Sequence, residues 1–216
     1  MRAMTSPSVD SMIDHRLFAS TPLVRSPFEF VVVPGFVPEH AASEAARDFP
    51  GPDQPGVLPA PANPPDNAFG RLLRELRRPH LSAAFSEKFG LSLDPDTLMI
   101  TLRARTRPID GRIHTDSETK LATALIYLNT GWESPGGRLR LLRGPDDIND
   151  MIAEVPPHAG TLLAFRRAAN SWHGHVPYEG VRRAVMLNWM VNAATARREL
   201  RRHALSASFK SWFGHS

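Results

Sequence analysis

The sequence predicts a mainly β protein of the α+β class, with helices on either side of a run of strands. From residue 97 onward, short apolar runs alternate with turn residues, which is the pattern of β-strands. The runs are TLMITLRAR, LATALIYL, GGRLRLL, GTLLAF and RRAVMLNWMVN. Spacing of this kind favours a sandwich, a barrel or a jelly roll over alternating β and α units.

The amino-terminal part of the chain predicts an arm, a strand and a helix. Residues 1–27 are polar, contain prolines and serines and show no periodicity, so we expect a flexible arm. A single domain is expected over residues 28–216. It begins with a strand inside the segment 28–38, which stops at Pro34-Gly35, and a short helix follows directly.

The next segment predicts a loop and two helices. Residues 50–67 carry seven prolines and are not expected to form regular structure; they make either a loose surface loop or a stiff lid over a site. Asp66 or Asn67 caps a helix that ends at Pro79, and a further short helix covers about 82–90. The first of these helices has one apolar stripe, formed by Phe69, Leu72, Leu73 and Leu76.

The chain ends in a predicted basic amphipathic helix over about 194–213. Its apolar side could pack on the sheet, contact a second copy in a homodimer or meet an acidic membrane surface. That side is formed by Leu205, Phe209, Trp212 and Phe213, and the basic residues are Arg197, Arg198, Arg201, Arg202 and Lys210.

Composition excludes several classes of chemistry. The sequence has no cysteine, so a disulfide, a thiolate nucleophile, a cysteine-ligated zinc and an iron–sulfur cluster are all excluded. A net charge of +4 is too mild to indicate nucleic-acid binding. The sequence contains no apolar run that could form a transmembrane segment and no signal-peptide core, so a cytoplasmic location is expected.

Two short motifs offer metal ligands. His114 and Asp116 are two residues apart, so on a strand both side chains leave the same face. Alone, such a pair also fits a surface pair or a structural histidine. His173 lies in SWHGHVP, and two histidines with one carboxylate leave three metal positions open, as in non-heme Fe(II) oxygenases. A zinc hydrolase could use the same ligands.

An arginine at the start of the last predicted strand offers an anion site. Arg182 and Arg183 must point in opposite directions, so one of them should point inward, and a buried arginine needs an anion. An oxygenase that splits 2-oxoglutarate needs a cation for the distal carboxylate of that cosubstrate, and the fork of an arginine suits it.

Together these motifs resemble the Fe(II)/2-oxoglutarate-dependent dioxygenases of the prolyl-hydroxylase-like branch. The resemblance covers about residues 97–191 and consists of H-x-D, a strand ending in YLN, a following Trp, GG.L.L, a strand G.LL.F, and a His followed by Pro and Arg. It implies that the core is a double-stranded β-helix (jelly roll), supported by the amino-terminal helices.

The resemblance implies a role for five residues. His114, Asp116 and His173 would hold Fe(II), while Arg182 and Tyr127 would bind the distal carboxylate of 2-oxoglutarate. Dioxygen would be the second cosubstrate, and ascorbate would stimulate the reaction. The implied activity is hydroxylation of an unactivated C–H bond of a small molecule, a sugar or lipid intermediate or an amino-acid side chain, with release of succinate and CO2.

Two positions depart from that pattern or leave it open. Where relatives often have a Tyr near the cosubstrate, this chain offers Arg103 and Arg105, which could serve there or contact an anionic substrate. His175 would face the same way as His173, but the spacing to Pro177 matches the family only when it is counted from His173. His175 is then expected to support a metal ligand without touching the metal, to face the substrate, or to have a structural role.

Two other functions fit part of the pattern. A cupin-type metal-binding jelly roll could act as an isomerase, a hydrolase or a small-molecule binder without 2-oxoglutarate, but Arg182 and Tyr127 would then be unexplained. A catalytically inactive relative could bind a partner through its basic tail, although the complete set of expected ligands argues against this.

Overall fold

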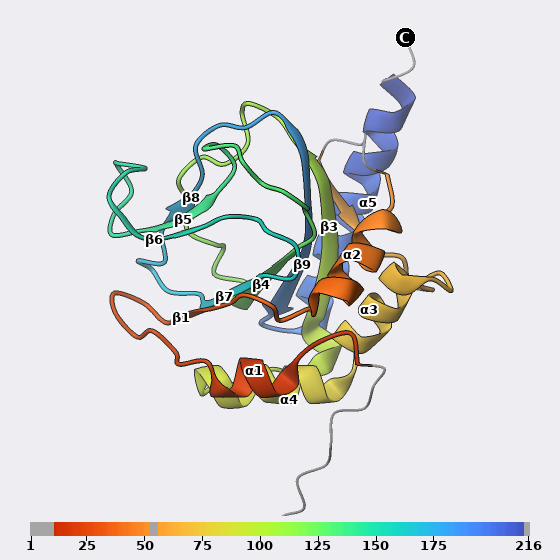
Figure 1. The fold of residues 1–216 in the computed structure, drawn as a ribbon, viewed down its shortest axis with the longest axis horizontal. Coiled ribbons are helices and arrows are strands. Elements are labelled where there is room, and N and C mark those ends of the chain that lie inside the picture. The colour runs from red at the N-terminus through yellow and green to blue at the C-terminus, as the bar shows by residue number, and fades with distance from the viewer. Residues whose placement is uncertain (1–10, 52–55, 214–216) are drawn as a thin grey trace, which may run out of the picture.

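The computed structural model describes residues 11–51 and 56–213, with side chains of the last helix described as far as residue 205 (Figure 1). The strands are β1 (Phe30–Val33), β2 (Val57–Pro59), β3 (Leu98–Thr106), β4 (Lys120–Tyr127), β5 (Leu139–Leu142), β6 (Met151–Val155), β7 (Leu162–Arg166), β8 (His173–Gly174) and β9 (Gly180–Met190). The helices are α1 (His15–Ser20), α2 (Glu39–Arg47), α3 (Ala68–Leu76), α4 (Pro79–Phe89) and α5 (Ala193–Phe213), with a 3-10 turn at Pro95–Thr97.

Two antiparallel sheets face each other and form an open jelly roll. The larger sheet has the order β1-β7-β4-β9-β3-β2, and the smaller has the order β6-β5-β8. Helices α1 to α4 cover the side of the larger sheet that faces away from the smaller one (Figure 1). The predicted mainly β fold with helical support is therefore confirmed.

Strand alternation divides the larger sheet into two faces. In β4, Ala122, Ala124 and Ile126 join the core beneath the helices, while Leu125 and Tyr127 join the core between the sheets. In β9, the ring of Trp189 lies 4.6 Å from that of Phe85 in α4, and its indole nitrogen donates a hydrogen bond to Ser82. The helices thus hold the sheet from one side and leave the other side for a site.

The Pro-rich segment is more regular than the sequence predicts. Residues 57–59 form β2, which pairs with β3 at the edge of the sheet, where a strand can contain a proline. Arg74 in α3 and Arg77 directly after it donate hydrogen bonds to the carbonyl groups of residues 61, 62, 64 and 65. A Cβ at Gly70 would lie 1.8 Å from the Pro65 carbonyl oxygen, so only glycine allows this close approach. The segment is fixed against α3 because backbone acceptors, not apolar side chains, hold it there.

The expectation of a flexible arm is wrong for residues 11–27, while residues 1–10 lie outside the described part of the chain. Asp14 caps α1 by accepting from the Leu17 amide at 2.8 Å. Phe18 is buried against Phe36 and Phe85. A helix of 6 residues is too short to show a helical repeat of apolar residues in the sequence. Its stability comes from tertiary contacts, which the sequence does not show.

Replacing Phe18 with alanine should therefore destabilise the whole protein. Loss of a buried phenylalanine side chain costs about 3–5 kcal/mol of unfolding free energy. Urea denaturation would measure this, with Val24→Ala as the control, because Val24 belongs to the same segment but is 44% exposed. If the two variants unfolded at the same urea concentration, the packed position of α1 would be wrong.

The carboxy-terminal helix forms where it is predicted, and of its predicted apolar side only Leu205 is described. Leu205 is 70% exposed, and the side chains of Phe209, Trp212 and Phe213 lie outside the described residues. The helix instead contacts the sheet through Ala196, which clusters with Met99 and Met190. Among the described residues, no helix is both long and apolar enough to cross a membrane.

Candidate metal centre

Three predicted ligands come together at one end of the space between the sheets. One ligand atom from each of His114, Asp116 and His173 lies within 4.8 Å of the others. The backbones of the two histidines form an antiparallel bridge, in which each amide donates to the other's carbonyl oxygen at 3.0 Å. The two rings are consequently on the same side, with centroids 4.3 Å apart. Asp116 follows in the loop that leads into β4.

Carbonyl groups orient both imidazole rings. The Nδ1 atom of His114 is 2.8 Å from the Arg112 oxygen, and that of His173 is 3.0 Å from the Ser171 oxygen. Because a carbonyl only accepts, each Nδ1 carries a proton, and in the neutral ring the lone pair that a metal can bind is then on Nε2. Burial lowers the pKa of His173 to about 4, so this ring is neutral at neutral pH.

The carboxylate of Asp116 is held from two directions. Lys120 Nζ lies 2.6 Å from Oδ1, and the Thr123 hydroxyl donates to Oδ2. Burial alone would raise the pKa of Asp116, but the charge of Lys120 and the hydrogen bonds from Lys120 and Thr123 outweigh it, and the pKa is lowered. Two imidazole lone pairs and an ionised carboxylate form a donor set that suits Fe(II). Neither Lys120 nor Thr123 belongs to the sequence-based set, although Thr123 shares a strand face with Tyr127.

The three ligands line a cavity of about 370 Å³ between the sheets. Its wall is formed by alternate residues of the larger sheet, by the H-x-D loop and by the turn of α5 that carries Glu199, Arg202 and His203. The last helix therefore forms part of the cavity wall, which no local pattern in the sequence predicts.

A buried arginine faces the same cavity. Arg182 is 3% exposed, and its Nε donates to the Gly137 carbonyl at 2.7 Å. Its Nη2 lies 3.4 Å from the Tyr127 hydroxyl, and the guanidinium lies 5.2 Å from the centre of that ring. Within the described part of the chain, no carboxylate forms an ion pair with Arg182. Burial raises the pKa of Tyr127, which keeps the hydroxyl protonated. Of the two adjacent arginines, Arg182 lines the cavity and Arg183 does not.

The two positions that the sequence leaves open are also resolved in space. Arg103 lines the cavity and Arg105 does not; the Nη1 of Arg103 is 3.4 Å from Asp110, and its buried Nε has no hydrogen-bond partner among the described atoms. His175 is 6% exposed and also lines the cavity. Its ring lies against Gly111, where a Cβ would be 2.3 Å from the imidazole, so His175 positions the loop before His114.

Comparison with known proteins gives a family match over part of the chain and a similar fold. Residues 106–191 match the model of the 2OG-Fe(II) oxygenase superfamily, whose members use Fe(II), 2-oxoglutarate and dioxygen. A search of curated proteins finds no match. Among solved structures, a prolyl-4-hydroxylase of Pseudomonas putida is 18% identical with a TM-score of 0.58, and the alignment covers 76% of this chain and 92% of that one.

A second solved structure agrees in fold. A prolyl 4-hydroxylase of Phytophthora capsici is 20% identical with a TM-score of 0.54, and the alignment covers 74% of this chain but only 57% of that one. At these identities the likeness concerns the fold alone. Over residues 106–191 this chain therefore resembles the 2OG-Fe(II) oxygenase superfamily, and the converging His, Asp and His side chains and the jelly-roll core agree with that match.

Proposed function

We propose that this protein is a hydroxylase that uses Fe(II), 2-oxoglutarate and dioxygen to oxidise an unactivated C–H bond, releasing succinate and CO2. The observation that carries the proposal is one cavity that holds both a metal-binding triad and a buried guanidinium without a carboxylate partner among the described residues. A buried cation requires an anion, and the cosubstrate supplies one.

His114, Asp116 and His173 would hold the iron. When bound, Fe(II) supplies the activation of dioxygen that no side chain of this protein can supply. The protein's own part is to present the ligands in the right state. The carbonyl groups behind the two rings accept from Nδ1, so that in the neutral rings the lone pair lies on Nε2, while Lys120 and Thr123 hold the carboxylate ionised and in one orientation.

Arg182 and Tyr127 would bind the distal carboxylate of 2-oxoglutarate. The Nε of Arg182 is already bound to the Gly137 carbonyl, so its terminal nitrogens are the donors left for an anion. The Tyr127 hydroxyl accepts from Nη2 and can donate its own proton to the same carboxylate. Both groups are buried, so water competes little for them.

The proposed substrate is a small molecule, a sugar or lipid intermediate or an exposed side chain that carries an anionic group. Besides Arg182, the cavity wall presents Arg103, Lys120, Arg202 and His203. Lys120 forms an ion pair with Asp116, and Arg202 forms one with Glu199 at 2.9 Å. Arg103 has only the longer contact to Asp110, so it is the residue with donors to spare for a substrate anion.

The proposed class is tested without knowing the substrate. Anaerobic addition of Fe(II) and 2-oxoglutarate should produce a weak visible charge-transfer absorption band, and admission of air with ascorbate should release succinate slowly. A protein that gave neither signal while binding Zn(II) tightly would not be an oxygenase of this type. A mass-spectrometric screen for products that gain one oxygen atom would then identify the substrate.

Replacing Arg103 with glutamine tests the anionic substrate. Loss of one charge-assisted hydrogen bond costs about 1.5–3 kcal/mol, so the KM for the substrate should rise by roughly 10- to 100-fold. Arg105→Gln is the matched control, because Arg105 is in the same strand but outside the cavity lining. If the KM for 2-oxoglutarate rose instead, Arg103 would bind the cosubstrate.

A further inference from the structure

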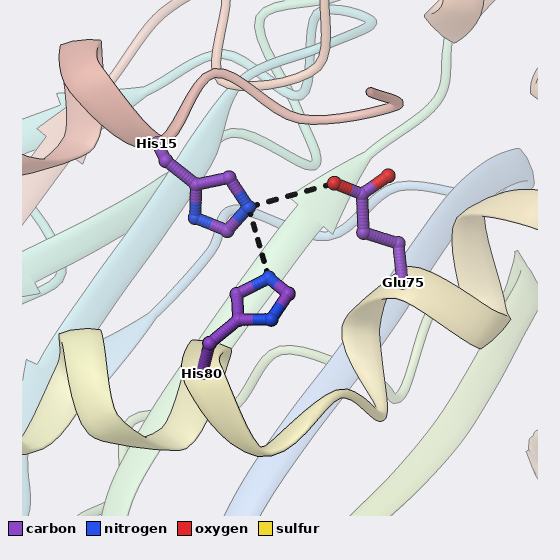
Figure 2. Close-up of side chains that lie close together, drawn as sticks. All are labelled: His15, Glu75 and His80. Atoms are coloured by element: carbon purple, nitrogen blue, oxygen red, sulfur yellow. Dashed lines mark hydrogen bonds and ion pairs between the residues drawn. The ribbon is translucent and has the colours of Figure 1, made fainter. Parts of the chain in front are cut away.

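A second group of metal-ligating side chains lies on the supporting helices. His15 comes from α1, Glu75 from α3 and His80 from α4, and one ligand atom from each lies within 4.8 Å of the others. Figure 2 shows the two imidazole rings directed toward each other, with the Glu75 carboxylate facing His15. The oxygenase function uses none of these residues.

This group is separated from the iron triad by the larger sheet. Asn188 in β9 lines the cavity, whereas the next residue, Trp189, faces the other way and packs on Phe85 of α4. His80 lies in the first turn of that same helix. A ligand bound here would therefore contact neither the cosubstrate nor the substrate.

The two separations measured from His15 are close to those of a tetrahedral zinc ion, and the ligand atoms of Glu75 and His80 lie within 4.8 Å of each other. His15 Nε2 lies 3.2 Å from His80 Nε2 and 3.5 Å from Glu75 Oε1. Zinc binds nitrogen and oxygen ligands at about 2.0–2.2 Å, and tetrahedral angles then place ligand atoms about 3.3–3.6 Å apart. Two imidazoles and one carboxylate also form a ligand set that zinc accepts.

The carboxylate is fixed in place by its neighbours. Glu75 is 8% exposed; its Oε1 accepts from the Ser11 hydroxyl at 2.6 Å, and its Oε2 accepts from the Met12 amide at 2.6 Å. Oε1 retains a lone pair on the side of His15. Second-layer hydrogen bonds of this kind orient metal ligands in proteins. The amino-terminal segment therefore supplies both a ligand, His15, and the support for another.

The protonation states also suit a cation. Burial would raise the pKa of Glu75, but hydrogen bonds from His15, Ser11 and Met12 outweigh it, and the pKa is lowered. Burial and the charges of His15 and Arg78 lower the pKa of His80. The two Nε2 atoms lie 3.2 Å apart, so one divalent cation could accept a lone pair from each of them.

We propose that His15, Glu75 and His80 bind a divalent cation of the zinc type, with the fourth position open to water on the exposed side of His80. The bound ion would join α1 to the α3–α4 pair and thereby fix the amino-terminal segment on the helical layer that supports the sheet. This site is independent of the iron triad and of the proposed hydroxylation.

The test uses Zn(II) alone and separates the two sites. In a His114→Ala/His173→Ala background, the metal content after equilibrium dialysis against buffered Zn(II) should be one zinc per chain. Adding His80→Ala should weaken zinc binding by at least about tenfold. Loss of a residue that only hydrogen-bonds to a metal ligand already weakens metal binding by about this factor. Adding His40→Ala should leave it unchanged, because His40 is an exposed histidine outside the cluster.

A second measurement guards against misfolding of the background variant. The wild-type protein should bind two zinc ions and His80→Ala one, and Zn(II) should raise the melting temperature of the His40→Ala control more than that of His80→Ala. The proposal would be overturned if the wild-type protein bound no zinc at His15, Glu75 and His80, or if His80→Ala and His40→Ala bound zinc with equal affinity. The cluster would then be a hydrogen-bonded pair of histidines beside a carboxylate.

Discussion

Alanine at His114, Asp116 or His173 is expected to abolish Fe(II)-dependent formation of succinate. Each residue supplies one of three ligand atoms that lie within 4.8 Å of one another, and among the described residues no fourth His or carboxylate belongs to this group. Endpoint assays with 2-oxoglutarate, ascorbate and Fe(II) would measure succinate, and metal analysis under anaerobic conditions would measure bound iron. Succinate formation at the wild-type rate in any one variant would remove that residue from the proposed set.

The informative control is His175→Ala. His175 is as buried as His173, lies two residues away and lines the same cavity. Its Nδ1 donates to the Val176 carbonyl, and its ring contacts Gly111. We therefore expect this variant to retain iron and uncoupled succinate formation while losing some turnover of the true substrate. Loss of iron from His175→Ala, with retention in His173→Ala, would exchange the roles of the two histidines.

The cavity could be predicted from the sequence where neighbouring residues on one strand set the geometry. His114 and Asp116 are two residues apart, and the adjacent Arg182 and Arg183 must face opposite sides, so local alternation is enough to predict converging ligands and one inward arginine. The structure agrees in both cases, although Asp116 lies in a loop rather than in a strand.

Features that depend on distant contacts could not be predicted. Helix α1 is part of the core because the ring of Phe18 packs against Phe36 and Phe85. Contacts between such distant residues produce no periodic pattern in the sequence. Lys120 and Thr123 matter because the loop after His114 folds back onto β4.

The second cluster and the last helix show the same limit. His15 and His80 are 65 residues apart, so no ligand spacing in the sequence indicates a site. Leu205 belongs to the apolar side that the sequence predicts, yet α5 contacts the sheet through Ala196, which lies on the opposite side of the helix. Periodicity predicts that a helix has an apolar side but not which of several candidate sides finds a partner.

Replacing Arg182 with alanine should raise the KM for 2-oxoglutarate by roughly 10- to 100-fold, because a charge-assisted pair with a desolvated carboxylate is worth about 1.5–3 kcal/mol. The value of kcat should change less, since the lost contact is made equally before and during the reaction. Initial rates of succinate formation over a range of 2-oxoglutarate concentrations would separate the two parameters.

Arg183→Ala is the matched control, since it removes the same charge from the opposite face of β9 and should leave the KM for 2-oxoglutarate unchanged. Tyr127→Phe should raise this KM only a few-fold, because a neutral hydrogen bond contributes about 0.5–1.5 kcal/mol. Arg182→Lys should restore part of the affinity at most, because an ammonium cannot keep the Gly137 carbonyl and bind a carboxylate with two parallel donors at once. If Arg183→Ala raised the KM and Arg182→Ala did not, the distal carboxylate of 2-oxoglutarate would bind on the face of β9 that carries Arg183, and the role proposed for Arg182 would be wrong.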